Sequence, residues 1–132
     1  MDEARLRRKI AVIMAADVVG YSRLVAENED ATLKRLMEYR EIFADFVSRG
    51  RGRIFNTAGD AVLAEFDSAV EAVRAAMDIQ EALKTRNALI ADKQRMIFRI
   101  GVSLGDVVGR DGDLLGDGVN IAARLQALAA PG

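Results

Sequence analysis

The sequence predicts an α+β fold, a ferredoxin-like split βαβ sandwich with helices packed on one face of a sheet. Two observations lead to this prediction. Two long segments with helical periodicity are separated by a pair of short strand-like segments, and an apolar, β-branched segment precedes the first helix. The expected order along the chain is β-α-β-β-α-β-α.

The chain begins with a buried strand and a long helix. Residues 9–19 are apolar without polar alternation, which is typical of a strand buried on both faces. Asp30 is a suitable N-cap for a helix that ends near Arg49, with Gly50 as its C-cap. The expected apolar face of this helix consists of Leu33, Leu36, Met37, Phe43 and Val47.

A hairpin and a second long helix follow. Residues 53–56 and 61–66 favour strands, and the turn between them ends in Gly59 and Asp60, where glycine gives the backbone freedom at φ. Ser68, with Glu71 three residues later, forms a capping box at the start of the second helix. Its expected apolar face consists of Val70, Val73, Met77 and Leu83.

The last third of the chain is more polar. Residues 87–94 form a connection, and residues 96–105 alternate as a strand that residues 107–109 extend or follow with another strand. A loop rich in glycine and aspartate is expected over residues 109–118. A final helix is expected over residues 119–129.

The expected organisation is a solvated N-terminal arm over residues 1–9 and one domain over residues 10–132. No apolar run is long enough to span a bilayer, and the start lacks the features of a signal peptide, so a cytoplasmic location is expected.

Composition limits the function. The 132 residues carry 19 basic and 20 acidic side chains, a net charge of −1, so binding of nucleic acid or of an anionic membrane by bulk charge is not indicated. Cysteine and histidine are absent, which excludes disulfides, zinc-thiolate sites and histidine-dependent catalysis. A bound metal must therefore have oxygen ligands, which favours Mg²⁺, Mn²⁺ or Ca²⁺.

Two carboxylates are candidates for such a metal site. Asp17 ends the apolar first strand, where an N-cap and a ligand are equally good interpretations. Asp60 stands at the hairpin tip, where an ordinary turn aspartate is the simpler interpretation. In a split βαβ sheet the first strand lies beside the hairpin, so both carboxylates can reach the same cations. Paired carboxylates with two hard cations suit phosphoryl chemistry.

Asn120 and Arg124 are candidates for a phosphate site. They are four residues apart and therefore share a helix face. Arg124 offers a planar fork of donors for phosphate oxygens. Taken without context, a solvated polar face is the simpler interpretation.

The stretches AADVVGYSRL, FNTAGDAVLAEF and GDLLGDGVNIAARLQ, in this order and at these separations, resemble the class III adenylate/guanylate cyclase catalytic domain. The resemblance covers residues 10–128 and is to a bacterial group often found in rhizobia. It implies the class III nucleotide cyclase fold and an enzyme of cyclic nucleotide signalling. The implied reaction converts ATP, or alternatively GTP, to the 3′,5′-cyclic nucleotide and pyrophosphate.

The resemblance also implies roles for individual residues. Asp17 and Asp60 would hold two Mg²⁺ or Mn²⁺ ions, with the carbonyl of Val18 assisting one ion. Asn120 would position the ribose, and Arg124 would stabilise phosphate charge in the transition state. In this family the sites are shared across a head-to-tail homodimer, with the metal ligands from one subunit and Asn120 and Arg124 from the other.

Asn56 and Asp113 fall where the family contacts the purine, but the sequence also departs from the family pattern. Most adenylate-specific members carry lysine at the position of Asn56, which weakens the usual basis for preferring ATP. Asp106 stands where many members have an arginine that helps to hold phosphate. The family domain continues past Gly132, so the chain is expected to be truncated at its C-terminus.

These departures favour an alternative function, a degenerate cyclase-like domain that binds nucleotide or dimerises without turnover. A ferredoxin-like interaction domain with no nucleotide site is a further alternative, which explains the fold but not the three motifs.

Overall fold

The computed structural model describes residues 7–110 and 113–115, with side chains described over residues 10–105. Its elements are β1 (Arg7–Val18), α1 (Tyr21–Glu27), α2 (Glu29–Arg49), β2 (Arg53–Ala58), β3 (Ala61–Phe66), α3 (Ala69–Asn87), the 3₁₀ helix η2 (Asp92–Gln94), β4 (Phe98–Arg110) and β5 (Asp113–Leu115). Among the described residues, no helix is both long enough and apolar enough to cross a membrane.

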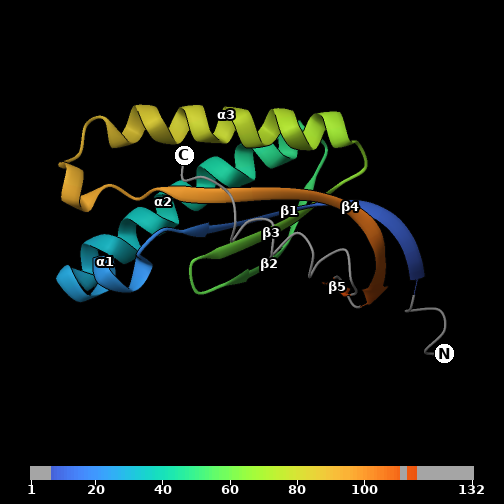
Figure 1. The fold of residues 1–132 in the computed structure, drawn as a ribbon, viewed down its shortest axis with the longest axis horizontal. Coiled ribbons are helices and arrows are strands. Elements are labelled where there is room, and N and C mark those ends of the chain that lie inside the picture. Colours follow the sequence, from blue (N-terminus) through green and yellow to red (C-terminus); the bar gives the residue numbers. More distant parts are fainter. Residues whose placement is uncertain (1–6, 111–112, 116–132) are drawn as a thin grey trace.

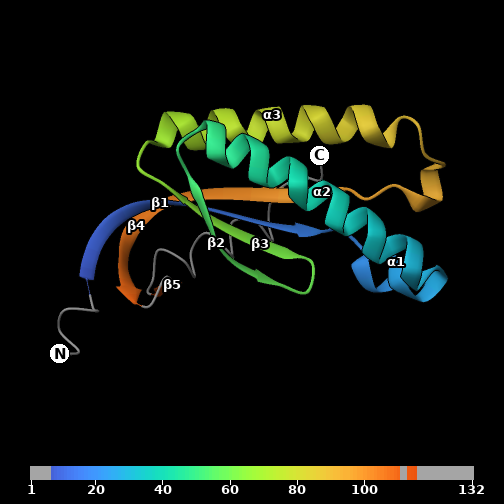
Figure 2. The same ribbon diagram turned by 180° about the vertical axis from the view of Figure 1, so that it is seen from behind.

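The sheet has the topology of a split βαβ unit. Its strand order is β2-β3-β1-β4-β5, and each neighbouring pair is antiparallel. Since β3 lies between β1 and β2 and is antiparallel to both, β1 and β2 run in the same direction with one strand between them. The helices α2 and α3 pack together on one face of the sheet (Figure 1 and Figure 2). The ferredoxin-like sandwich predicted from the sequence is therefore confirmed.

The main core lies between this face and the two helices. Alternate residues of β1, including Met14 and Ala16, point toward the helices because successive side chains of a strand point to opposite faces. Phe43 of α2 packs on Phe98 of β4 with ring centroids 4.9 Å apart and a tilt of 53°. The buried helix residues of this core are Leu24, Leu36, Tyr39, Phe43, Val47, Ala72, Ala75, Ile79 and Leu83.

The opposite face of the sheet carries a smaller apolar cluster. Ala11, Ile13 and Ala15 of β1 are buried there, and Phe55 and Leu63 of the hairpin pack against them. This face, which α2 and α3 do not cover, is called the open face below. The alternation that places Ala15 on it places Asp17 on it as well.

The start of the first long helix differs from the prediction. A short helix, α1, precedes it, and the N-cap of α2 is Asn28, whose Oδ1 accepts a hydrogen bond from the Ala31 nitrogen at 3.1 Å. Asp30 instead lies in the first turn of α2, where its negative charge complements the helix dipole. The prediction missed α1 because seven residues are too few to show a helical period.

The predicted apolar faces were only partly correct. Leu36, Phe43, Val47 and Leu83 are buried as expected, whereas the expected core residues Leu33, Met37, Val70, Val73 and Met77 are exposed. In α3 the face that meets the sheet and α2 begins with two alanines, Ala72 and Ala75, and continues with Ile79 and Leu83. Because alanine lets two backbones approach closely, the larger valines are not required at the contact.

Other predicted features are confirmed. The Ser68 hydroxyl accepts from the Glu71 nitrogen at 3.3 Å and caps α3. Gly50 ends α2, and Gly59 adopts a φ of 56° in the hairpin turn. In contrast, β4 runs on to Arg110 and pairs with β5, where a loop over residues 109–118 was expected. The predicted helix over residues 119–129 lies outside the described residues.

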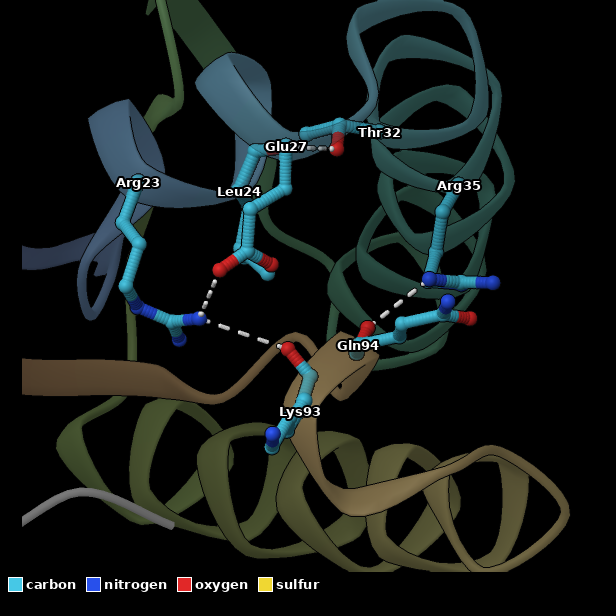
Figure 3. A network of polar contacts seen from close by, with 7 residues as sticks. All are labelled: Arg23, Leu24, Glu27, Thr32, Arg35, Lys93 and Gln94. Carbon is cyan, nitrogen blue, oxygen red and sulfur yellow. Dashed lines mark hydrogen bonds and ion pairs between the residues drawn. The ribbon is translucent and has the colours of Figure 1, made fainter.

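A polar network fixes α1 and the start of α2 to the connection before β4 (Figure 3). Arg23 donates to the Glu27 carboxylate at 3.2 Å and to the Lys93 carbonyl at 3.4 Å. Arg35 donates to the Gln94 carbonyl at 2.8 Å. Since α1 begins just after β1 ends, this network joins the segment that follows Asp17 to the connection before β4.

Candidate metal and nucleotide site

Asp17 lies at the end of β1 on the open face. In the antiparallel register it stands opposite Arg99 of β4, and the Arg99 Nη2 is 3.4 Å from the Asp17 Oδ1. About a third of each side chain is exposed, 30% for Arg99 and 29% for Asp17. Asp17 is therefore a partly buried, ion-paired carboxylate, and it does not cap α1, whose N-cap is Gly20 without a side-chain bond.

Asp60 lies in the turn between β2 and β3, and it reaches the end of β1. Its Oδ2 accepts a hydrogen bond from the backbone nitrogen of Val18 at 2.8 Å. The paired residues of β1 and β3 end at Ala16 and Val62, so the carboxylate takes the place of the next ladder partner. The following nitrogen, that of Val19, donates to the Ile97 carbonyl on the β4 side at 2.8 Å.

The electrostatics of Asp17 reflect this proximity. Burial raises the pKa of the Asp17 carboxyl above its usual value, the positive charge of Arg99 opposes that rise, and the negative charge of Asp60 adds to it. The charged form of Asp17 is thus disfavoured in the folded protein. A positive ion between the two acids would relieve both the repulsion and the loss of hydration.

The donor set fits a hard divalent cation. Two carboxylates are brought together, and carboxylate oxygen is the ligand that Mg²⁺ and Mn²⁺ prefer. Among the side chains that the structure describes, no group of three or more histidine, cysteine, aspartate or glutamate residues is placed to hold a metal ion. Mg²⁺ is commonly bound by one or two carboxylates together with substrate phosphates and water, so two carboxylates are sufficient.

Asn56 lies on the same face as Asp17 but two strands away. It pairs with Leu63 of β3, which in turn pairs with Ala15 of β1, so these three residues form a row across the open face. Asn56 is half-buried. Asn56 therefore lies on the face that carries Asp17, in the row of Ala15, which is two residues before Asp17 in β1.

The remaining predicted residues are placed only in part. Asp113 begins β5, where it pairs with Arg110, and Asp106 pairs with Ile10 in the β1 and β4 ladder. Their side chains are not described. Asn120 and Arg124 lie outside the described residues.

Arg99 contacts the candidate ligand Asp17 and was not identified from the sequence. Strand alternation in residues 96–105 shows that Arg99 faces away from the apolar side of β4. The pairing partner of Arg99 depends on the register between β1 and β4, which no local pattern specifies. The arginine opposite Asp17 therefore emerges only from the structure.

Comparisons with known proteins show the family to which the chain belongs. The family described as "Adenylate and Guanylate cyclase catalytic domain" matches residues 5–132. A solved structure of an adenylate/guanylate cyclase/hydrolase from Silicibacter pomeroyi is similar, with a TM-score of 0.88 and 43% identity over 96% of this chain and 74% of that one.

Two curated relatives extend the comparison. A Rhizobium meliloti (strain 1021) protein, whose name gives it provisionally as adenylate cyclase 3, is 45% identical over 100% of this chain and 23% of its own length. An adenylate cyclase of Streptomyces coelicolor is 35% identical over 97% of this chain and 32% of its own length. The chain thus spans about a quarter to a third of these relatives. It belongs to the family of class III adenylate and guanylate cyclase catalytic domains.

Proposed function

We propose that this chain is an adenylate cyclase domain that converts ATP to 3′,5′-cyclic AMP and pyrophosphate in the cytoplasm. The observation that carries the proposal is the contact of Asp60 with the backbone of Val18, the residue that follows Asp17, together with the action of the Asp60 charge on Asp17. The names of the curated relatives support ATP over GTP as the substrate.

Asp17 and Asp60 are the residues that would hold two Mg²⁺ or Mn²⁺ ions, with the Val18 carbonyl as a further oxygen ligand. When bound, such ions lower the pKa of an attacking hydroxyl and neutralise phosphate charge. The Val18 N–H orients the Asp60 carboxylate by engaging one of its oxygens, which leaves other lone pairs available. Arg99 neutralises part of the charge on Asp17 before a cation arrives.

The nucleotide would be bound by residues from both subunits of a head-to-tail homodimer. Asn120 would position the ribose so that its 3′ oxygen faces the α-phosphorus, and Arg124 would stabilise the charge that develops on the phosphates. Asn56 and Asp113 would contact the purine. The position of Asn56 on the open face, together with Asp17, supports a shared site on that face.

Turnover by the full chain tests the proposal. Cyclic AMP and cyclic GMP formation are measured with ATP or GTP and Mn²⁺ for the wild type and for Asp60→Asn. We expect cyclic AMP from the wild type and a loss of roughly a hundredfold or more in the variant. Asp67→Asn, which removes an exposed acid just beyond the hairpin, is the matched control and should keep wild-type turnover. Equal turnover by wild type and Asp60→Asn would refute the proposal.

A second candidate function is a cyclase-like domain that binds nucleotide without turnover. The ion pair between Arg99 and Asp17 favours it, because the guanidinium competes with a cation for the same carboxylate. This alternative predicts that ATP with Mn²⁺ raises the melting temperature of the protein while no cyclic nucleotide forms.

A further inference from the structure

The turn that carries Asp60 needs support from outside the hairpin. Gly59 has a φ of 56°, and residues 57–59 are exposed at the tip. The hairpin ladder closes with the pairing of Ala58 and Ala61, so its own hydrogen bonds do not fix the direction of the Asp60 side chain. A ligand for a cation has to be held to within a fraction of an ångström, and an exposed two-residue turn does not provide that alone.

One side chain of α2 supplies a contact to this turn. The Nη2 of Arg40 donates a hydrogen bond to the carbonyl oxygen of Gly59, the residue that precedes Asp60. Both views show the hairpin turn at the same end of the molecule as α1 and the start of α2 (Figure 1 and Figure 2). The peptide group held by Arg40 is thus the one that leads directly into the carboxylate.

Arg40 projects from a firmly anchored part of α2. The preceding residue, Tyr39, is buried, and its hydroxyl donates to the Oδ1 of Asn87 in α3 at 2.8 Å. Leu36 and Phe43, which lie one turn before and after, are both in the core. The Arg40 guanidinium therefore connects the hairpin tip to a part of α2 that is packed in the core.

The guanidinium is also partly desolvated. Within the described part of the chain, the Nε of Arg40 is buried and makes no hydrogen bond. A buried N–H without a partner costs free energy, so this placement is not one that a freely solvated surface arginine would adopt. A lysine could donate to the same carbonyl without burying a second donor.

We propose that Arg40 is a positioning residue that holds the turn at Gly59 and thereby keeps Asp60 against the Val18 backbone. Only the role of Asp60 as a cation ligand rests on the proposed function. The chain of contacts runs from the Arg40 guanidinium to the Gly59 carbonyl, and from the Asp60 carboxylate to the Val18 N–H.

Amide hydrogen exchange in the full chain tests the positioning directly. In Arg40→Met we expect the Val18 amide to exchange roughly tenfold faster, because its acceptor is no longer held in place. The Val19 amide, which donates to the Ile97 carbonyl, is an internal control and should be unchanged. Arg40→Lys should restore slow exchange at Val18. Unchanged exchange at Val18 in Arg40→Met would overturn the proposal.

Arg35→Met is the matched control variant, because Arg35 also donates from α2 to a backbone carbonyl, that of Gln94, outside the hairpin. It should leave the Val18 amide as it is in the wild type. If Arg35→Met accelerates exchange at Val18 as much as Arg40→Met does, the effect is general loosening of α2 and the proposal fails.

Binding of Mn²⁺, followed by electron paramagnetic resonance, separates this proposal from the proposed function. If both hold, Arg40→Met should bind Mn²⁺ roughly tenfold more weakly than the wild type, while Arg35→Met binds it equally well. If the wild type binds no Mn²⁺ but Val18 responds as expected, the positioning by Arg40 stands and the proposed function fails. Equal Mn²⁺ binding and equal Val18 exchange in Arg40→Met and wild type would overturn the positioning alone.

Discussion

The Asp60 carboxylate accepts a hydrogen bond from the Val18 backbone at 2.8 Å, although the two residues are 42 positions apart in the sequence. The contact occurs just beyond the last paired residues of β1 and β3. The Asp60 side chain there accepts the hydrogen bond that a backbone carbonyl would accept if the ladder continued. It brings the Asp60 carboxylate to the end of β1, where its negative charge acts on Asp17. Burial and the neighbouring charge then disfavour ionisation of Asp17.

Removing the Asp17 charge should change how stability depends on pH. Because the pKa of Asp17 is raised in the folded protein, its contribution to stability is present below the unfolded value of 3.8 and is lost as pH rises through the folded value. In Asp17→Asn, measured without divalent cations, the free energy of unfolding should therefore fall less than in the wild type between about pH 4 and about pH 7.

Urea unfolding of both proteins across this range measures the difference. Asp67→Asn is the control, because it removes an exposed carboxylate from outside the site. A pH-independent difference between Asp17→Asn and the wild type would show that the carboxylate is not disfavoured by its surroundings.

Tyr39 should govern part of the stability at alkaline pH. Burial raises the pKa of its hydroxyl above 10.0, against the opposing charges of Arg35 and Arg86. The stability that the neutral hydroxyl provides is present below the unfolded pKa and is lost as pH rises through the folded pKa. Tyr39→Phe should cost about 1 kcal/mol near neutral pH, through loss of the bond to Asn87, and should lose less stability on going to alkaline pH.

Urea unfolding at neutral and alkaline pH checks this, with Tyr21→Phe as the control that retains the hydroxyl of Tyr39. A steeper alkaline loss in Tyr39→Phe than in wild type would contradict the assignment.

Gly52 should be the least replaceable glycine of the hairpin region. A Cβ atom there would lie 2.6 Å from the Phe66 ring and 2.9 Å from the Glu65 carbonyl oxygen, so the core or the β2 and β3 ladder must move. We expect Gly52→Ala to lower the free energy of unfolding by about 1–3 kcal/mol.

Gly59→Ala is the comparison, because a Cβ at Gly59 meets no atom within 4 Å and only its φ of 56° is unfavourable. It should cost about 1 kcal/mol, which is typical for a non-glycine residue in the left-handed region. If denaturation curves show a larger loss of stability in Gly59→Ala than in Gly52→Ala, crowding against Phe66 does not determine which side chain fits at position 52.

The parts of the fold that depend on local pattern could be predicted from the sequence. The apolar run of β1, the glycine in the hairpin turn and the cap at Ser68 each carry their own pattern and are confirmed. The apolar faces of the helices were harder, since Val70 and Met77 are as apolar as core residues. That they are exposed follows from the close packing of α3 through Ala72 and Ala75.

The candidate site divides in the same way. The family motifs predict roles for Asp17 and Asp60, and the split βαβ topology explains why the hairpin tip reaches the end of β1. The partners of these acids could not be predicted, because Arg99 is set by the register of β4 against β1 and Arg40 by the packing of α2 over the hairpin. Both are tertiary relationships between segments that share no local pattern.

Mn²⁺ binding to the wild type, to Asp17→Asn and Asp60→Asn, and to the double variant tests most directly whether the two acids form one cation site. If they act as a unit, each single substitution should abolish most of the binding, and the double variant should be little worse than either single variant. Wild-type Mn²⁺ affinity in either single variant would contradict the account.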